Sequence, residues 1–393
     1  MSRSPWIIAL VVLFSAQDIS AQPSVTGVSG TVSHAGSITI TGSAFGTKAT
    51  AAPYKWEDAN GTNGDRLESR GWLVADQLQE PDLSTAVLRG TPSETTVIRL
   101  RHGMSGGSDD VGLFGFGRDS EGAYVGLTAE SAVNETAEDL PTTLYIDYWM
   151  RMTEAVASTA DNFKILRHHR YTGSDNGGLG FVSGSSAAPL QHFGSSEGSW
   201  QGISGGWDTE IALGDLDDTW VHLQFVTRWT SPDGMAIIYV DGVRASNLTG
   251  RNFTSRANWF FETQGLNDTG NPGQYLVYFD DIYIDTSFAR VEICAGASYS
   301  SKGHCEIQRP SAWNATSITA TVYRGTFGAT DAAYVYVCDS DNSCDSSGYA
   351  VTFGDDPGGG ASAPVRIRIR PDVASVCVLP IAWMVRRLRR EDQ

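Results

Sequence analysis

The sequence predicts an all-β protein built from two β-sandwich domains, one of them interrupted by the other. Three observations support this prediction. Strand-like segments along the chain alternate apolar and polar residues with a period of two. The 393 residues include 43 glycines and only 19% charged residues, a composition that does not favour long amphipathic helices. The length is sufficient for more than one hydrophobic core.

The chain is strongly acidic, with a formal net charge of −17 at pH 7. Proteins bind nucleic acids through surfaces that neutralise the phosphate backbone, so this charge argues against a nucleic-acid partner. Lysine is scarce and occurs only at Lys48, Lys55, Lys164 and Lys302.

Residues 1–21 have the pattern of a secretory signal peptide. Arg3 supplies the positive start, Trp6 to Phe14 form a short apolar run, and Ile19-Ser20-Ala21 resembles a cleavage site. The run is too short to span a bilayer, and the alternative is a buried N-terminal strand. We therefore expect a secreted or cell-surface protein with bacterial-type export.

Short β-branched runs occur near the N-terminus, after the predicted signal peptide, and again beyond residue 289, and they predict strands. At the N-terminal end the predicted strands lie in 23–29 and 36–46, and at the C-terminal end they lie in 290–294, 313–322, 333–338 and 348–353.

The motifs "SVTGVSG" and "GSITITGSAFG" resemble the opening strands of the IPT/TIG family, and "WNATSITATV" is similar to a late strand of that family. The resemblance implies an immunoglobulin-like sandwich split between residues 22–52 and 289–354. The segment 53–288 would then be an inserted domain, which a surface loop accepts readily when the ends of the insert lie close together. The alternative is two unrelated small β modules that flank a central domain.

The cysteine spacing predicts two disulfides, Cys294–Cys305 and Cys338–Cys344. Each pair flanks a short loop of the kind found at hairpins, and an exported chain meets an oxidising compartment. Cys377 is left without a partner. A metal site at these cysteines is disfavoured, because neither a C-x-x-C pair nor a nearby histidine pattern accompanies them.

Two central segments, 142–152 and 219–228, show the clearest alternation. One side of the predicted strands is apolar: Leu144, Ile146, Tyr148, Met150, Val221, Leu223 and Phe225. The other side is polar or amphipathic: Tyr145, Asp147, Trp149, Arg151, His222, Gln224 and Arg228. This pattern is typical of an antiparallel sheet that packs on one face only.

The segments "TWVHLQFVTRW", "GMAIIYVDGVR" and "LVYFDDIYID" resemble the concanavalin A-like jelly roll of laminin-G modules, lectins and polysaccharide lyases. The resemblance implies two curved sheets over residues 53–288, with a concave face that binds glycan.

On this basis the polar positions of the central strands are candidate ligands for an anionic polysaccharide. Aromatic rings stack on sugars, and guanidinium groups match carboxylate geometry. The candidate substrate-binding residues are Arg99, Arg101, Trp149, Arg151, Lys164, Arg170, Gln224 and Arg228. Ordinary solvated residues on a polar face are the alternative.

The leading functional hypothesis is a secreted or surface-displayed carbohydrate-binding protein. One alternative is a polysaccharide lyase acting by β-elimination, with His168, His222 and Tyr145 as candidate catalytic acid–base residues and an arginine that neutralises the uronate. The strand motifs Q-I-H and R-S-E-L of alginate-type lyases are absent from the sequence. A second alternative is a non-catalytic structural adhesin.

Asp280 and Asp281 are candidate ligands of a structural Ca²⁺, by similarity to jelly-roll carbohydrate modules, and no other cofactor is expected. The alternative is that they are simply polar residues of a strand. Residues 355–393 form a Gly-rich linker and a tail with seven arginines. This tail is either a membrane or cell-surface attachment signal or a final packed strand with a basic end.

Overall fold

The structure is a computed structural model that describes residues 21–354 with internal gaps. The gaps are 75–81, 103–110, 117–141, 154–162, 173–174, 184–188, 195–210, 213–217, 229, 231, 252–257 and 266–274. Almost all of the proposed signal peptide, Cys377 and the basic tail lie outside the described residues. The predictions made for them therefore stay predictions.

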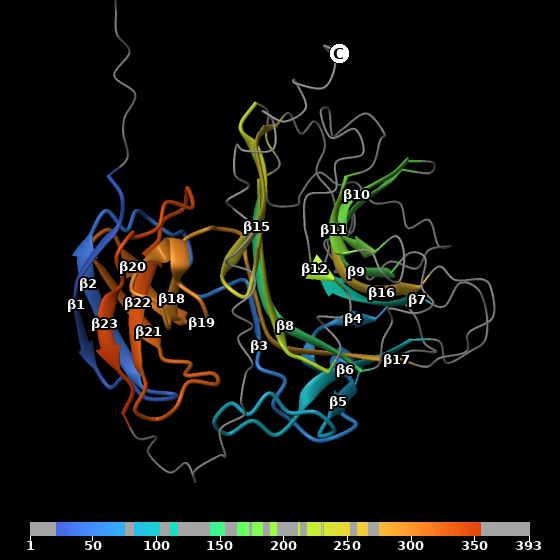
Figure 1. Ribbon diagram of the computed structural model, residues 1–393, viewed down its shortest axis with the longest axis horizontal. Helices are drawn as coiled ribbons and strands as arrows, with labels where there is room; N and C mark the ends of the chain where they lie inside the picture. The colour runs from blue at the N-terminus through green and yellow to red at the C-terminus, as the bar shows by residue number, and fades with distance from the viewer. Residues whose placement is uncertain are drawn as a thin grey trace, which may run out of the picture.

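The described residues form four β-sheets stacked as two sandwiches (Figure 1). All of their strand pairings are antiparallel. Helical structure in this part of the chain is limited to 3₁₀ turns such as Leu67–Arg70 and Tyr299–Ser301. The prediction of an all-β protein is thus confirmed. No helix among the residues described is long and apolar enough to cross a membrane.

The first sandwich is assembled from both ends of the described chain. Its outer sheet has the order β1 (Ser24–Gly30), β2 (Ser37–Ser43), β21 (Ser317–Thr321) and β20 (Arg309–Asn314). Its inner sheet has the order β19 (Cys305–Ile307), β18 (Arg290–Cys294), β22 (Ala332–Cys338) and β23 (Tyr349–Thr352). Ile38, Ile40, Val291, Ile293 and Val335 are among the side chains that fill the core between the two sheets. Membership of the IPT/TIG family stays a prediction.

The prediction of one continuous strand over 313–322 is wrong. The structure breaks it into the end of β20 and the start of β21. The Asn314 side chain causes the turn, because its Oδ1 accepts hydrogen bonds from the backbone amides of Thr316 and Ser317 at 3.0 and 2.8 Å. Asparagine side chains commonly replace backbone acceptors in this way.

The second sandwich is formed by the segment between β2 and β18. Its larger sheet has the order β15 (Val243–Arg251), β14 (Gly234–Val240), β13 (Val221–Arg228), β8 (Thr143–Thr153), β17 (Tyr275–Asp285), β6 (Val97–His102) and β5 (Asp82–Ser84), and β3 (Lys55–Glu57) also pairs with β17. The second sheet has the order β12 (Ile211–Ala212), β11 (Pro189–Gly194), β10 (Asp175–Ser183), β9 (Phe163–Thr172), β16 (Asn258–Gly265), β7 (Val111–Phe116) and β4 (Leu73–Val74).

The predicted apolar sides of β8 and β13 are confirmed. The seven residues assigned to those sides are all buried in one hydrophobic core, together with Trp72, Ile98 and Phe279. The two-sheet architecture agrees with what the jelly-roll resemblance implies. We call the larger sheet, which includes β3, the eight-stranded sheet, and the other the seven-stranded sheet.

The two sandwiches meet along β18, which is buried on both of its sides. Val291 and Ile293 point into the core of the first sandwich, whereas Arg290 and Glu292 face the eight-stranded sheet. The first sandwich therefore covers the polar side of β8 and β13 (Figure 1). In order, the four layers are the outer sheet, the inner sheet, the eight-stranded sheet and the seven-stranded sheet.

The backbones of the two sandwiches also touch at a tight turn. Asp241 and Gly242 connect β14 to β15 with φ angles of 48° and 75°, the left-handed conformation that an Asp-Gly pair adopts in hairpin turns. A Cβ atom added to Gly242 would lie 2.1 Å from the carbonyl oxygen of Gly303, in the loop between β18 and β19. Only glycine permits this approach.

We expect Gly242→Ala to lower the free energy of unfolding by about 2–3 kcal/mol, because it combines left-handed strain with a backbone clash across the interface. Gly64 is a matched control, since its φ is 90° and an added Cβ would meet nothing within 4 Å. Gly64→Ala should cost only about 1–2 kcal/mol from backbone strain. Urea denaturation of both variants gives the comparison, and equal losses would contradict the assigned contact.

Candidate functional site

The polar side of the eight-stranded sheet lies beneath the first sandwich. Tyr145, Trp149, His222 and Gln224 are at most 2% exposed. The residues that cover them come from β18, β19 and the loop that joins these strands. This side of the sheet is an internal interface between the two domains.

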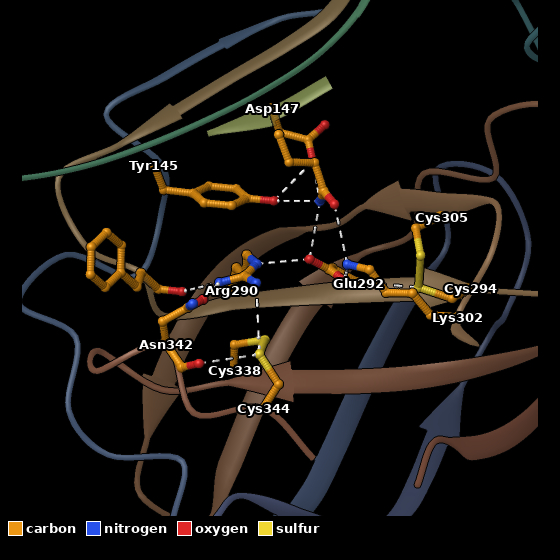
Figure 2. Close-up of polar contacts among 12 residues, drawn as sticks. Tyr145, Asp147, Arg290, Glu292, Cys294, Lys302, Cys305, Cys338, Asn342 and Cys344 are labelled. Carbon is orange, nitrogen blue, oxygen red and sulfur yellow. Dashed lines mark hydrogen bonds and ion pairs between the residues drawn. A yellow bond between two sulfur atoms is a disulfide. The ribbon is translucent and has the colours of Figure 1, made fainter. Parts of the chain in front are cut away.

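The centre of the interface is a network around two cations from the first sandwich, which we call the Lys302 cluster (Figure 2). The Lys302 ammonium lies 2.5 Å from Glu292 Oε2, and Arg290 Nε lies 2.7 Å from Glu292 Oε1. Gln224 connects this group to the eight-stranded sheet. Its amide nitrogen donates to Tyr145 at 2.7 Å and to Asp147 at 2.8 Å, and contacts Glu292 at 3.2 Å.

The two cations keep Glu292 ionised despite its burial. Desolvation alone would raise its pKa, but the charges of Lys302 and then Arg290 outweigh that effect and hold the pKa at about 2. Arg290 also lies over the Tyr145 ring, 4.4 Å from its centroid. Arg290 and Glu292 of the first sandwich thus each contact a residue of the eight-stranded sheet, Tyr145 and Gln224 respectively.

A second network, the Arg89 cluster, lies on the same interface. The Arg89 guanidinium contacts Asp280 Oδ2 at 3.0 Å, Glu306 Oε1 at 2.8 Å and Asp281 Oδ2. Asp280 and Asp281 belong to β17, whereas Glu306 belongs to β19 of the first sandwich. All four side chains are at most 1% exposed. One guanidinium thus joins carboxylates from both domains.

Three buried carboxylates share one cation in the Arg89 cluster, and their pKa values separate accordingly. Glu306 has a pKa of about 2, because Arg89 and then His304 outweigh the effect of burial. Burial raises the pKa of Asp281 to about 7, and burial and the neighbouring Asp281 raise that of Asp280 well above its usual range. The Oδ1 atoms of both aspartates have no hydrogen-bond partner, which favours a neutral acid over a carboxylate. We infer that the aspartate pair retains a proton near neutral pH.

The predicted Ca²⁺ site does not fit this arrangement. A calcium ion needs six or more oxygen ligands. Arg89 instead places a permanent positive charge against one oxygen of Asp280 and one of Asp281. The guanidinium group thus occupies the place beside these carboxylates where the jelly-roll resemblance implied a calcium ion.

An aromatic bridge connects the two clusters. Arg89 lies 4.5 Å from the centroid of the Trp149 ring, and Trp149 stacks on His222 with centroids 4.7 Å apart and an interplanar angle of 11°. His222 Nε2 is 2.8 Å from Asp147 Oδ1. Burial lowers the pKa of His222, but Asp147 outweighs it and raises the value above that of free histidine.

The predicted arginine ligands are distributed over several surfaces. Arg99 pairs with Asp82 at 2.6 Å, and Arg151 pairs with Asp218 at 3.0 Å. Arg228 contacts Asp341 of the first sandwich at 3.2 Å and lies at the rim of the interface. The side chains of Arg101, Lys164, His168 and Arg170 lie outside the described part of the structure.

The prediction of one open groove is therefore wrong. Tyr145, Trp149, His222 and Gln224 are covered, and β9, which carries Lys164, His168 and Arg170, belongs to the other sheet. The candidate acid–base residues do not converge, because Tyr145 and His222 are on the eight-stranded sheet and His168 is on the seven-stranded one. The sequence analysis assigned the two sides of β8 and β13 correctly, but it did not predict what covers the polar side.

The main interface residues missed by the sequence analysis are Arg89, Arg290, Glu292, Lys302 and Glu306. A signal for two of them was present. The strand "RVEIC" alternates charged and apolar residues, as a strand facing solvent on one side would. Only its pairing with the equally polar face of β8 distinguishes a buried charged side from an exposed one.

Both predicted disulfides are present, Cys294–Cys305 and Cys338–Cys344. Cys294 and Cys305 face each other across β18 and β19, and so close the loop that carries Lys302. Glu292 lies beside these sulfur atoms, but the sulfurs are bonded to each other, so the group does not fit a metal ion.

No protein-family model matches the chain, and none of the curated proteins is similar to it in sequence. Among solved structures, alginate lyase Aly36B has a TM-score of 0.38 and 16% identity, covering 60% of this chain and 98% of the lyase. Alginate lyase vAL-1 from Chlorella virus has a TM-score of 0.33 and 13% identity, covering 59% of this chain and 99% of that one. A GH131 β-glucanase catalytic domain from Podospora anserina has a TM-score of 0.32 and 12% identity, covering 59% and 84%. Similarity at this level assigns neither a family nor an activity.

Removal of the shared guanidinium should be severely destabilising. We expect Arg89→Met to lower the free energy of unfolding by about 3–5 kcal/mol, because it leaves three buried acidic groups without their cation. Addition of Asp280→Asn should restore part of the loss. Arg99→Met is the matched control, since the Arg99–Asp82 pair is partly exposed, and it should cost about 1 kcal/mol or less. Chemical denaturation compares the four proteins.

The interface should also weaken in acid. Glu292 and Glu306 have folded pKa values of about 2 against 4.5 for free glutamate. Their contribution to stability is complete above the unfolded value and is lost as the pH falls through the folded one. We expect thermal scans to show a melting temperature that drops from about pH 4.5 towards about pH 2. Glu292→Gln should melt lower overall but with a shallower acid decline, and an unchanged slope would refute the assignment.

Proposed function

We propose that the chain is an exported polysaccharide-binding protein whose ligand face is the outer side of the seven-stranded sheet, centred on β9. The polar side of the eight-stranded sheet is excluded as a binding face, because the first sandwich covers it. The seven-stranded sheet lies on the side of the eight-stranded sheet that faces away from the first sandwich (Figure 1).

The position of β9 supports this placement. β9 lies inside the seven-stranded sheet, with β10 on one side and β16 on the other. It pairs with both neighbours along most of its length.

The observation that carries the proposal is the composition of β9. Its sequence, FKILRHHRYT, combines three cationic residues with two histidines and a tyrosine. In the strand register Arg167 pairs with Gly180 of β10, and His169 pairs with Gly178. Glycine within a strand often marks a place where a ligand approaches the backbone.

The chemistry of these positions favours an anionic polysaccharide. A guanidinium binds a uronate carboxylate through paired hydrogen bonds, and aromatic rings stack on sugar faces. The Aly36B and vAL-1 lyases named above are described as acting on alginate, a polymer of this class. A lyase is the second candidate function, favoured by the presence in β9 of histidine and tyrosine, residue types that act as base and acid in β-elimination.

We expect Arg167→Ala and His169→Ala each to weaken binding to alginate about tenfold or more in Kd, the effect of losing one charged hydrogen bond. Affinity electrophoresis or calorimetry measures the change. Arg99→Ala, on the eight-stranded sheet, is the control and should bind like the unmodified protein.

Ultraviolet absorbance of unsaturated uronates, recorded on the same samples, separates the two candidate functions. A signal that Arg167→Ala and His169→Ala abolish identifies a lyase, whereas binding without a signal identifies a binding protein. Neither binding nor turnover across alginate, glucuronan and heparinoid would overturn the proposal and favour a structural adhesin.

A further inference from the structure

The Arg89 cluster, at the interface between the sandwiches, contains more acidic side chains than cationic ones. Arg89 contacts Asp280, Asp281 and Glu306, and His304 Nε2 lies 3.1 Å from Glu306 Oε1. Glu94 lies nearby and accepts hydrogen bonds from the backbone amides of Arg89 and Thr91 at 2.8 and 2.9 Å. This excess of acid is located at the seam where β17 meets β19.

We propose that this seam is a proton-dependent latch: the two sandwiches are held together while the Asp280–Asp281 pair and His222 carry protons, and they separate locally when those protons are lost. The latch is independent of the glycan face proposed above, because it lies on the opposite side of the second sandwich.

The geometry explains why proton loss would act on the seam. Full ionisation of Asp280 and Asp281 places two negative charges beside Glu306, which comes from the other domain. Tyr323, from the first sandwich, donates a hydrogen bond to Thr91 Oγ1 of the second sandwich at 3.1 Å. Burial and then the neighbouring Asp281 raise the pKa of Tyr323 well above its usual range, so its hydroxyl stays neutral beside the aspartate pair.

His222 acts in the same direction from the other end of the aromatic bridge. The groups that face it are Asp147 on β8, Asp241 in the turn after β14, and Lys302, His304 and Glu306 from the first sandwich. Protonated His222 neutralises Asp147, and loss of that proton leaves Asp147 with only neutral donors from Tyr145 and Gln224.

The sign of the pH dependence follows from these groups. Folded Asp281 has a pKa of about 7 against 3.8 for free aspartate, so the folded chain binds more protons between these values. Its stabilising contribution is lost as the pH rises through that window. The raised pKa of His222 extends the loss above 6.5. Burial raises the pKa values of Asp241 and Asp285 too, and both act in the same sense.

Hydroxyl-radical footprinting of the full chain can test the latch, with Trp149 as the reporter. Trp149 is 2% exposed and lies at the seam, whereas Trp72 is 1% exposed and lies in the core of the second sandwich. We expect oxidation of Trp149 to rise about tenfold between about pH 5 and about pH 9 while Trp72 stays protected. Equal protection of Trp149 at both pH values would overturn the proposal, as would simultaneous exposure of both residues.

Asp281→Asn provides the variant test. Asparagine has the same shape and tolerates the φ of 51° found at this position. The variant should keep Trp149 protected at about pH 9 and melt higher than the unmodified protein there, with no such gain at about pH 5. A structural role alone would lower stability at both pH values and would refute the latch. Asp82→Asn, which removes the partner of Arg99, is the matched control and should leave the pH profile unchanged.

Discussion

Two polar β-faces buried against each other are the constraint on which the arrangement of this protein depends. The outer two of the three interfaces between its four layers are apolar, as in ordinary sandwiches. The middle interface brings Arg89, Arg290 and Lys302 against buried carboxylates. Because an unpaired buried charge is costly, each side chain must meet its partner at one relative position of the sandwiches. Apolar contacts around Ile307 and Tyr145 add burial without fixing that position.

The polar interface specifies an orientation that hydrophobic packing alone would not. Apolar side chains tolerate shifts of register, whereas Glu292 must lie between Lys302 and Arg290 and also contact Gln224. The Cys294–Cys305 disulfide closes the loop that carries Lys302, which limits where this ammonium can reach. The close approach of Gly242 to Gly303 adds a steric limit at the same place. Charge, covalent closure and shape thus select the same docking geometry.

Much of the local structure could be predicted from the sequence, because strand alternation and turn chemistry are local properties. The two sides of β8, the Asp241–Gly242 turn and both disulfides follow from residue types and spacing. The covering of Tyr145, Trp149 and His222 could not be predicted, since a polar strand face looks the same whether water or another polar face meets it. Asp280 and Asp281 illustrate the limit. The jelly-roll resemblance implied a Ca²⁺ beside them, whereas the structure places Arg89 there, from a position nearly two hundred residues earlier in the chain.

The first sandwich is built from two chain segments that are far apart in the sequence, and the second sandwich brings them together. β2 pairs with β21 only after the whole intervening segment has been bridged, and long loops are entropically costly to close. Once the second sandwich has folded, its two ends are held together, as the 2.6 Å contact between Lys48 and Asp285 indicates. Closure of the first sandwich then spans a short distance. Arg290, Glu292 and Lys302 lie on the segment that leaves the second sandwich after β17, so the chain connection itself keeps these charges beside the polar face of β8.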